Sequence, residues 1–292
     1  MAIKIITDEK CGEYYLKRHP ERPERVLKTI ERLKNQTELN LHWESATFPE
    51  DSILFKTHSK QLIAAVKNPD GDFDPDTPAY PKIYEHALRA VGGAIKAAES
   101  AIKGECAFSL LRPPGHHATK TQAMGFCYFN NIATAVIYMS EKYPDCKIAI
   151  YDFDVHHGNG TEDIVLNRPN IAFYSVHEYP HYPGTGGTNV GENCFNYPIA
   201  PGSPRSDYLS KLKTALDDLL RFNPSIIAVS AGFDAYENDP LATQSLAVED
   251  YYWLGRQLKE TNIPVFCALE GGYSGELPEL IFAFLRGLNE KN

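Results

Sequence analysis

The chain has 292 residues, 43% of them hydrophobic, and a formal net charge of −9. No linker-like stretch, repeat or biased segment divides it, so we expect a single domain over residues 1–292. The negative charge disfavours a nucleic-acid partner, because phosphate binding requires a basic face. No apolar run reaches the roughly 18 residues of a membrane span, and the N-terminus becomes charged too early for a secretory signal. We therefore expect a cytoplasmic protein with no membrane partner.

Short β-branched apolar runs alternate with helix-length segments along the chain. The predicted strands cover 3–7, 107–111, 147–154, 171–176, 225–232 and 265–271. The predicted helices cover 22–35, 80–103, 129–142, 206–222, 248–261 and 276–288. This alternation predicts an α/β fold with a central, mostly parallel sheet covered by helices on both faces.

Clusters of polar residues begin where five of these predicted strands end. In chain order they are RPPGHHA (112–118), DFDVHHGNG (152–160), SVHEYPHYPGTGG (175–187), GFDAYENDP (232–240) and GGYSG (271–275). In open α/β sheets, sites form outside the carboxyl ends of the strands. We therefore expect the active site at that edge of the sheet.

The second of these clusters places Asp152, Asp154 and His156 two residues apart at the end of an apolar run. In an extended chain, alternate side chains share a face, so these three side chains are expected to converge on one small volume. Two carboxylates and an imidazole in one place are typical of a metal site, and core packing does not explain them.

Together these motifs resemble the arginase-like metal-dependent deacetylases, which include histone deacetylases, acetylpolyamine amidohydrolases and acetoin-utilisation proteins. The similar segments are HPERPERV (19–26), RPPGHHA, GFCYFNN (125–131), DFDVHHGNGT, YPGTG (182–186), AGFDAYENDPL (231–241) and LEGGY (269–273). The Asn at position 159 resembles the class II and polyamine branch of this family, since the class I enzymes usually carry Asp at this position. The resemblance implies a metal-dependent hydrolase that acts on an acetylated amine.

The resemblance also implies that the metal ligands are Asp154, His156 and Asp234. Three protein ligands leave an open coordination position, as a catalytic metal requires. Zn²⁺ is the expected ion, although Fe²⁺, Mn²⁺ or Co²⁺ also suits two carboxylates and one imidazole. A structural K⁺ site is implied at Ser175 and the backbone around Val176, with Asp152 shared between this site and the catalytic one.

Catalytic roles follow from the same resemblance. It assigns His117 as general base and then acid, His116 as its electrostatic partner, and Asp152 and Asn159 as the groups that orient the two rings. A carboxylate raises the pKa of a histidine more than a neutral amide does, so the two histidines should titrate differently. Tyr273 is implied as the donor that stabilises the oxyanion.

A substrate channel is implied by Gly125, Phe126 and Tyr182, which match aromatic walls around an aliphatic chain. Leu241 belongs to the same channel, and some polyamine-preferring relatives carry a carboxylate near that position. In the loop DGDFDPD (70–76), Asp74 or Asp76 would hold the substrate backbone or amine by resemblance. A solvated turn is an equal alternative for this loop, because DG and DP are turn signals.

Several functions remain open at this point. The leading hypothesis is removal of an acetyl group from acetyl-lysine in peptides or proteins, and the alternative is an N-acetylpolyamine deacetylase with the same mechanism. A non-catalytic acyl-lysine-binding relative is disfavoured by the intact set of residues, and a two-metal ureohydrolase would need more bridging carboxylates. The sequence does not indicate an oligomeric state.

Overall fold

A computed structural model describes residues 2–290, and within them eight strands form one sheet in the order β2-β1-β3-β8-β7-β4-β5-β6. The strands are β1 (Ile3–Thr7), β2 (Leu41–Ser45), β3 (Cys106–Ser109), β4 (Ile148–Asp152), β5 (Ile171–Glu178), β6 (Cys194–Ile199), β7 (Ile226–Ala231) and β8 (Val265–Leu269). Every neighbouring pair is parallel. The predicted α/β class is confirmed, and the sheet is entirely rather than mostly parallel.

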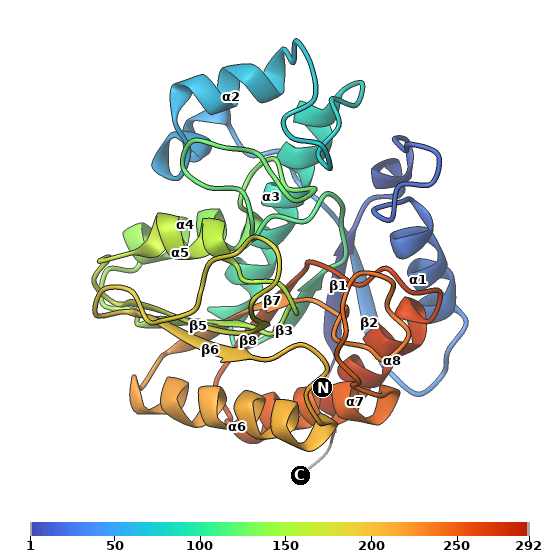
Figure 1. Ribbon diagram of the computed structural model, residues 1–292, viewed down its shortest axis with the longest axis vertical. Coiled ribbons are helices and arrows are strands. Elements are labelled where there is room, and N and C mark those ends of the chain that lie inside the picture. Colours follow the sequence, from blue (N-terminus) through green and yellow to red (C-terminus); the bar gives the residue numbers. More distant parts are fainter. Residues whose placement is uncertain (1, 291–292) are drawn as a thin grey trace.

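Helices cover both faces of the sheet, as Figure 1 shows. One layer contains α1 (Glu24–Lys34), α6 (Arg205–Arg221), α7 (Val248–Glu260) and α8 (Leu277–Leu288). The other contains α2 (Lys60–Lys67), α3 (Ile83–Ala101), α4 (Asn131–Lys142) and α5 (Asn159–Val165). Two 3-10 helices, η1 (Glu9–Gly12) and η2 (Asp51–Lys56), complete the described elements.

Each face of the sheet has its own hydrophobic core, because successive side chains of a strand point to opposite sides. In β4, Ala149 and Tyr151 pack with the layer of α6, α7 and α8. Ile148 and Ile150 pack with the layer of α3 and α4. Burial on both sides explains why the central strands are hydrophobic throughout. Among residues 2–290, no helix is both long and apolar enough to cross a membrane.

Two strands and two α-helices were not predicted from the sequence, and neither were the two 3-10 helices. Strands β2 and β6 are the two edges of the sheet, and β2 is only half-buried, so neither shows the apolar run of a central strand. β6 also contains Pro198, which is tolerated at an edge because its missing N–H faces away from a partner strand. Helices α2 and α5 have only eight and seven residues, too short to show a clear helical period.

Candidate active site

The carboxyl ends of β4 and β7 bring together Asp154, His156 and Asp234. One ligand atom from each residue lies within 4.8 Å of the others, and all three side chains are buried. His156 Nδ1 lies 3.2 Å from Asp154 Oδ1 and 3.0 Å from Asp234 Oδ2. The structure therefore assembles the three residues expected to hold a metal, from two strands that are neighbours in the sheet.

The way the chain reaches this arrangement differs from the prediction. Strand β4 ends at Asp152, so Asp154 and His156 do not belong to an extended segment. Instead, Asp152 Oδ1 accepts the N–H of Asp154 at 3.1 Å, and Asp154 Oδ1 accepts the N–H of His156 at 2.9 Å. Such carboxylate-to-backbone bonds stabilise turns. The expectation that alternation along a strand makes Asp152, Asp154 and His156 converge is wrong, since turns bend the chain there.

Backbone donors fix the orientation of both carboxylates. Gly271 donates its N–H to Asp154 Oδ2 at 2.7 Å, and Val155 donates its N–H to Asp234 Oδ1 at 2.9 Å. Burial and the neighbouring Asp154 raise the pKa of Asp234. Two fully buried carboxylates that face one imidazole form a donor set suited to a divalent cation with an open position. The residues present therefore fit the expected metal.

The two adjacent histidines lie beside this cluster with different partners. His116 Nδ1 lies 3.2 Å from Asp152 Oδ2, and His117 Nδ1 donates to Asn159 Oδ1 at 2.8 Å. Burial opposes protonation of His116, but the carboxylates of Asp154 and Asp152 outweigh it and raise its pKa to about 10. Burial and the neighbouring His116 and His156 hold the pKa of His117 well below its ordinary value. The pKa values of the two rings thus shift in opposite directions.

A fourth carboxylate, Glu270, supports the histidine pair and was not assigned a role from the sequence. Its Oε2 accepts the backbone N–H groups of Gly115 at 2.6 Å and His116 at 3.0 Å. Burial raises its pKa to about 7. Glu270 lies within the LEGGY segment, but only the sheet order, which places β8 beside β3, brings it under the histidines.

Tyr273 is held by two residues that are distant from it in the sequence. Asp239 Oδ2 accepts the backbone N–H of Tyr273 at 2.6 Å and that of Ser274 at 3.2 Å. Arg25 Nε donates to the carbonyl of Gly272 at 2.6 Å, and its guanidinium lies 4.8 Å from the centre of the Tyr273 ring. Asp239 and Arg25 were also not assigned roles, although both lie inside the similar segments. Together they fix the backbone and the ring of the predicted oxyanion donor.

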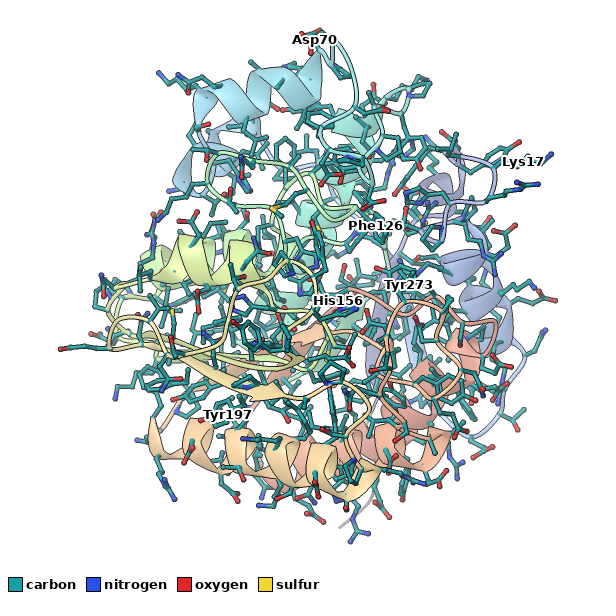
Figure 2. The ribbon with its side chains drawn as sticks, viewed as in Figure 1. Lys17, Asp70, Phe126, His156, Tyr197 and Tyr273 are labelled. Carbon is teal, nitrogen blue, oxygen red and sulfur yellow. The ribbon has the colours of Figure 1, made fainter. Side chains whose placement is uncertain are left out.

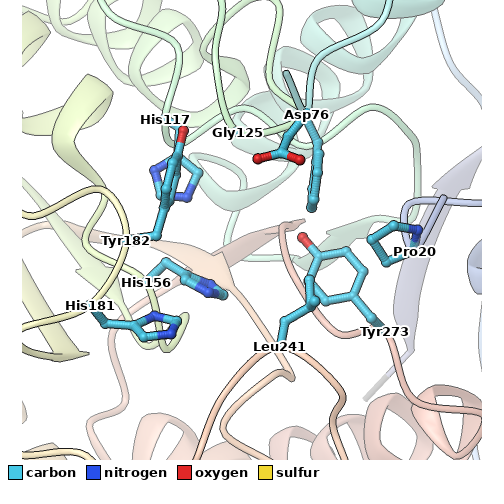
Figure 3. Close-up of a pocket in the computed structure, with 10 residues that line it drawn as sticks. Pro20, Asp76, His117, Gly125, His156, His181, Tyr182, Leu241 and Tyr273 are labelled. Carbon is cyan, nitrogen blue, oxygen red and sulfur yellow. The ribbon is translucent and has the colours of Figure 1, made fainter. Parts of the chain in front are cut away.

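These groups open into one cavity of about 360 Å³, which we call the pocket (Figure 3). It is lined by Pro20, Asp76, His117, Gly125, Phe126, His156, His181, Tyr182, Leu241 and Tyr273. All four residues of the predicted channel lie on its wall. In Figure 3, His117 and Tyr182 lie on one side of the pocket, and Tyr273 and Pro20 lie on the other.

The aromatic walls depend on an unusual backbone at Gly125 and Phe126, which both have positive φ angles of 56° and 68°. A Cβ at Gly125 would come within 2.6 Å of His117 Cδ2, so only glycine allows this close approach. Phe126 packs edge-on against Tyr273, with 5.6 Å between the ring centres.

The aspartate loop contributes two residues in different ways. Asp76 lines the pocket, whereas Asp74 Oδ2 accepts the N–H of Gly125 at 3.1 Å and supports the wall. Neither role could be chosen from the sequence. His181, which follows β5, lines the pocket as well and was not predicted.

The residues of the expected K⁺ site are buried and close in the sheet. Asp152 and Ser175 are paired in register between β4 and β5, and Val176 follows in the core. The Ser175 hydroxyl lies 2.9 Å from His177 Nδ1. The K⁺ site stays a prediction.

Comparison with known proteins gives consistent results. Residues 19–286 match the family described as the histone deacetylase domain. A probable deacetylase of Methanothermobacter thermautotrophicus is 40% identical, over 82% of this chain and 76% of its own. An acetylpolyamine amidohydrolase of Mycoplana ramosa is 37% identical, over 74% of this chain and 64% of its own. The crystal structure of an acetylpolyamine aminohydrolase from Burkholderia pseudomallei is similar in fold, with a TM-score of 0.89, 23% identity and 98% of each chain covered.

Proposed function

This chain belongs to the family of histone deacetylase domains, and we propose that it hydrolyses the amide bond of an acetylated amine, with acetyl-lysine in peptides or proteins as the substrate class. One observation carries the proposal: His117, His156 and Tyr273 line the same cavity, and His156 also belongs to the cluster of Asp154, His156 and Asp234. A general base, a metal ligand and an oxyanion donor that face one volume can act on one acyl group.

Asp154, His156 and Asp234 would hold a divalent cation, with Zn²⁺ as the expected ion. When bound, this cation supplies Lewis-acid polarisation of the acyl oxygen and lowers the pKa of a water molecule. The two carboxylates are already oriented by the backbone N–H groups of Gly271 and Val155, so little reorganisation accompanies binding.

The proton transfers fall to His117. Its Nδ1–H donates to Asn159, which leaves the lone pair on Nε2 free to accept a proton from the attacking water. A depressed pKa keeps this ring neutral before the reaction. The same nitrogen then delivers the proton to the departing amine. His116, which is paired with Asp152, contributes to the electrostatic field beside this ring.

Tyr273 would donate its hydroxyl proton in a hydrogen bond to the acyl oxygen as negative charge develops there. Its edge-on contact with Phe126 fixes the ring, and Tyr182 packs at right angles to His117 on the opposite wall. These aromatic faces exclude water from a methylene stem and align the acyl group with Nε2 of His117.

The alternative substrate is an N-acetylpolyamine, which the similarity to the acetylpolyamine amidohydrolase of Mycoplana ramosa favours. Leu241 favours acetyl-lysine instead, because it presents an apolar side chain at the mouth of the pocket where a second ammonium would need a carboxylate.

The test is hydrolysis of an acetyl-lysine peptide and of N-acetylputrescine by the purified protein, with and without a chelator and after Zn²⁺ is restored. We expect turnover that the chelator abolishes and Zn²⁺ recovers, with higher kcat/KM for the peptide. Absence of turnover of both substrates, although metal is bound, would contradict the proposal.

The proposed K⁺ site has its own test. We expect thermal stability to fall after exhaustive dialysis into Na⁺-free, K⁺-free buffer and to recover when K⁺ is added, because a bound ion stabilises the folded state alone. An unchanged Tm across these conditions would remove K⁺ from the description of the site.

A further inference from the structure

A second hollow of about 640 Å³, which we call the groove, meets the pocket at its mouth. It lies between the loop 15–24 and the pair Pro240 and Leu241. Pro20, Leu241 and Tyr273 line both cavities, so the groove adjoins the pocket. A substrate longer than a single side chain would therefore extend from the pocket into the groove.

Three cations line the groove, although the chain as a whole carries a net charge of −9. Lys17, Arg18 and Arg22 are exposed, and none of them forms an ion pair with a carboxylate within residues 2–290. Glu24 is the one acidic residue on the lining. The cations are thus available to a ligand in this part of the molecule.

Two nearby arginines, unlike these three cations, are buried and bonded to a carboxylate of the same segment. Arg25 and Arg112 are buried, and both donate to the carboxylate of Glu21. Lys17 projects outward from the loop in Figure 2, and in this view it and His156 lie on opposite sides of Tyr273.

The lining of the groove also offers apolar surface to a bound peptide chain. Tyr15 is 68% exposed and Leu16 is 51% exposed, and they lie next to the cations. Asp76, in the aspartate loop 70–76, lines the pocket next to the groove, and its backbone carbonyl lies 3.1 Å from Nε2 of His19, a residue of the groove. The groove therefore presents three cations and apolar side chains beside the mouth of the pocket. Charged groups at such a rim select partners by charge.

On the basis of the proposed deacetylase function, we propose that the groove binds an acidic segment of a peptide or protein chain next to the acylated lysine. Lys17, Arg18 and Arg22 would attract Asp or Glu side chains, while Tyr15 and Leu16 contact the chain itself. A free acetylpolyamine does not suit this surface, because its second ammonium would be repelled by three cations. The specificity would lie in the residues on one side of the acetyl-lysine.

The test uses three acetyl-lysine peptides of one length: three glutamates before the lysine, three glutamates after it, and three glutamines at both places. We expect one of the two acidic peptides to have a kcat/KM about three- to tenfold above that of the neutral peptide, the range of a few rim ion pairs. Raising the salt to about 0.5 M should reduce the ratio, because salt screens exposed charges.

Charge-reversal variants test whether the groove causes the preference for acidic peptides. Lys17→Glu/Arg22→Glu should lower the acidic-to-neutral ratio to one or below. The matched control, Lys103→Glu/Lys211→Glu, makes the same charge change at exposed lysines that do not line the groove or the pocket, and it should retain the wild-type ratio. Equal loss in both variants would mean that net charge alone sets the ratio and would overturn the proposal.

The remaining outcomes separate the two proposals. Chelator-sensitive turnover with equal kcat/KM for all three peptides would overturn the groove proposal and leave the deacetylase function standing. A free Nε-acetyl-lysine that is hydrolysed as well as the best acidic peptide would also overturn it, because one carboxylate would then suffice. Turnover of none of the peptides would overturn both.

Discussion

The floor and the mouth of the pocket are built in different ways. We call the cluster of Asp154, His156 and Asp234 the floor: His156 lines the pocket, and the cluster follows the ends of β4 and β7, where backbone N–H groups hold each carboxylate in place. The mouth consists of Gly125, Phe126, Tyr182 and Leu241, which lie on loops that pack against one another. From this difference we expect the cluster after β4 and β7 to govern the chemistry and the loops of the mouth to govern the choice of substrate. Substitutions in the floor should change kcat and metal content, and substitutions at the mouth should change the ratio between substrates.

The largest effect is expected from Asp234→Asn in the floor. Losing a residue that merely orients a ligand typically costs about 10- to 100-fold in metal affinity or activity, so losing the ligand itself should cost about 1000-fold or more. We expect loss of bound metal by elemental analysis together with loss of turnover. Asp217→Asn, at a half-buried residue of α6 that pairs with Lys213, is the control and should retain both. Full activity with one metal per chain in Asp234→Asn would exclude it as a ligand.

Tyr273→Phe should separate the oxyanion donor from the metal. The variant removes one hydroxyl at the wall of the pocket and leaves the cluster intact, so we expect kcat to fall about 100- to 1000-fold with unchanged metal content. Tyr252→Phe on α7 is the matched control. A wild-type kcat in Tyr273→Phe would contradict the assignment of Tyr273 as the oxyanion donor.

Asp239→Asn tests whether the Asp239 carboxylate positions Tyr273. Both carboxylate oxygens of Asp239 accept backbone N–H groups, Oδ2 from Tyr273 and Ser274 and Oδ1 from Leu241, so in either orientation the amide nitrogen of Asn faces a donor and disturbs this set of bonds. We expect kcat to fall about tenfold with little change in KM, because a donor displaced by a fraction of an ångström stabilises the transition state less well.

A double variant shows whether Asp239 acts through Tyr273. In the Tyr273→Phe background, Asp239→Asn should cost almost nothing further in kcat, since the group that it positions is already absent. Additive losses in kcat would instead indicate that Asp239 acts on the site by another route.

The smallest effect is expected at the mouth. Leu241→Glu would supply a carboxylate to a second ammonium, so the kcat/KM for N-acetylputrescine relative to an acetyl-lysine peptide should rise about threefold to fivefold, equivalent to up to about 1 kcal/mol. Leu241→Gln has a similar shape without the charge and should leave the ratio unchanged. An equal rise in both variants would show that size, and not charge, controls entry.

Much of the central sheet could be predicted from local sequence. The continuous apolar runs of β1, β3, β4, β5, β7 and β8 and the helical period of the long helices between them are visible within single segments. The edge strands β2 and β6 and the short helices α2 and α5 could not be predicted, because an exposed strand and a helix of two turns lack such a period.

The sequence by itself, through its resemblance to the deacetylases, determined which residues to expect in the site, since Asp154, His156, His116, His117 and Tyr273 stand in short motifs after strands. Only the tertiary structure decided how these groups are held. Glu270 reaches the histidines because β8 lies beside β3, Arg25 reaches Gly272 across 247 positions of the chain, and Asp239 reaches Tyr273 across 34. The physical reason is that a side chain's chemistry is local, whereas the partners that orient it come from strand order and loop packing, which no short segment encodes.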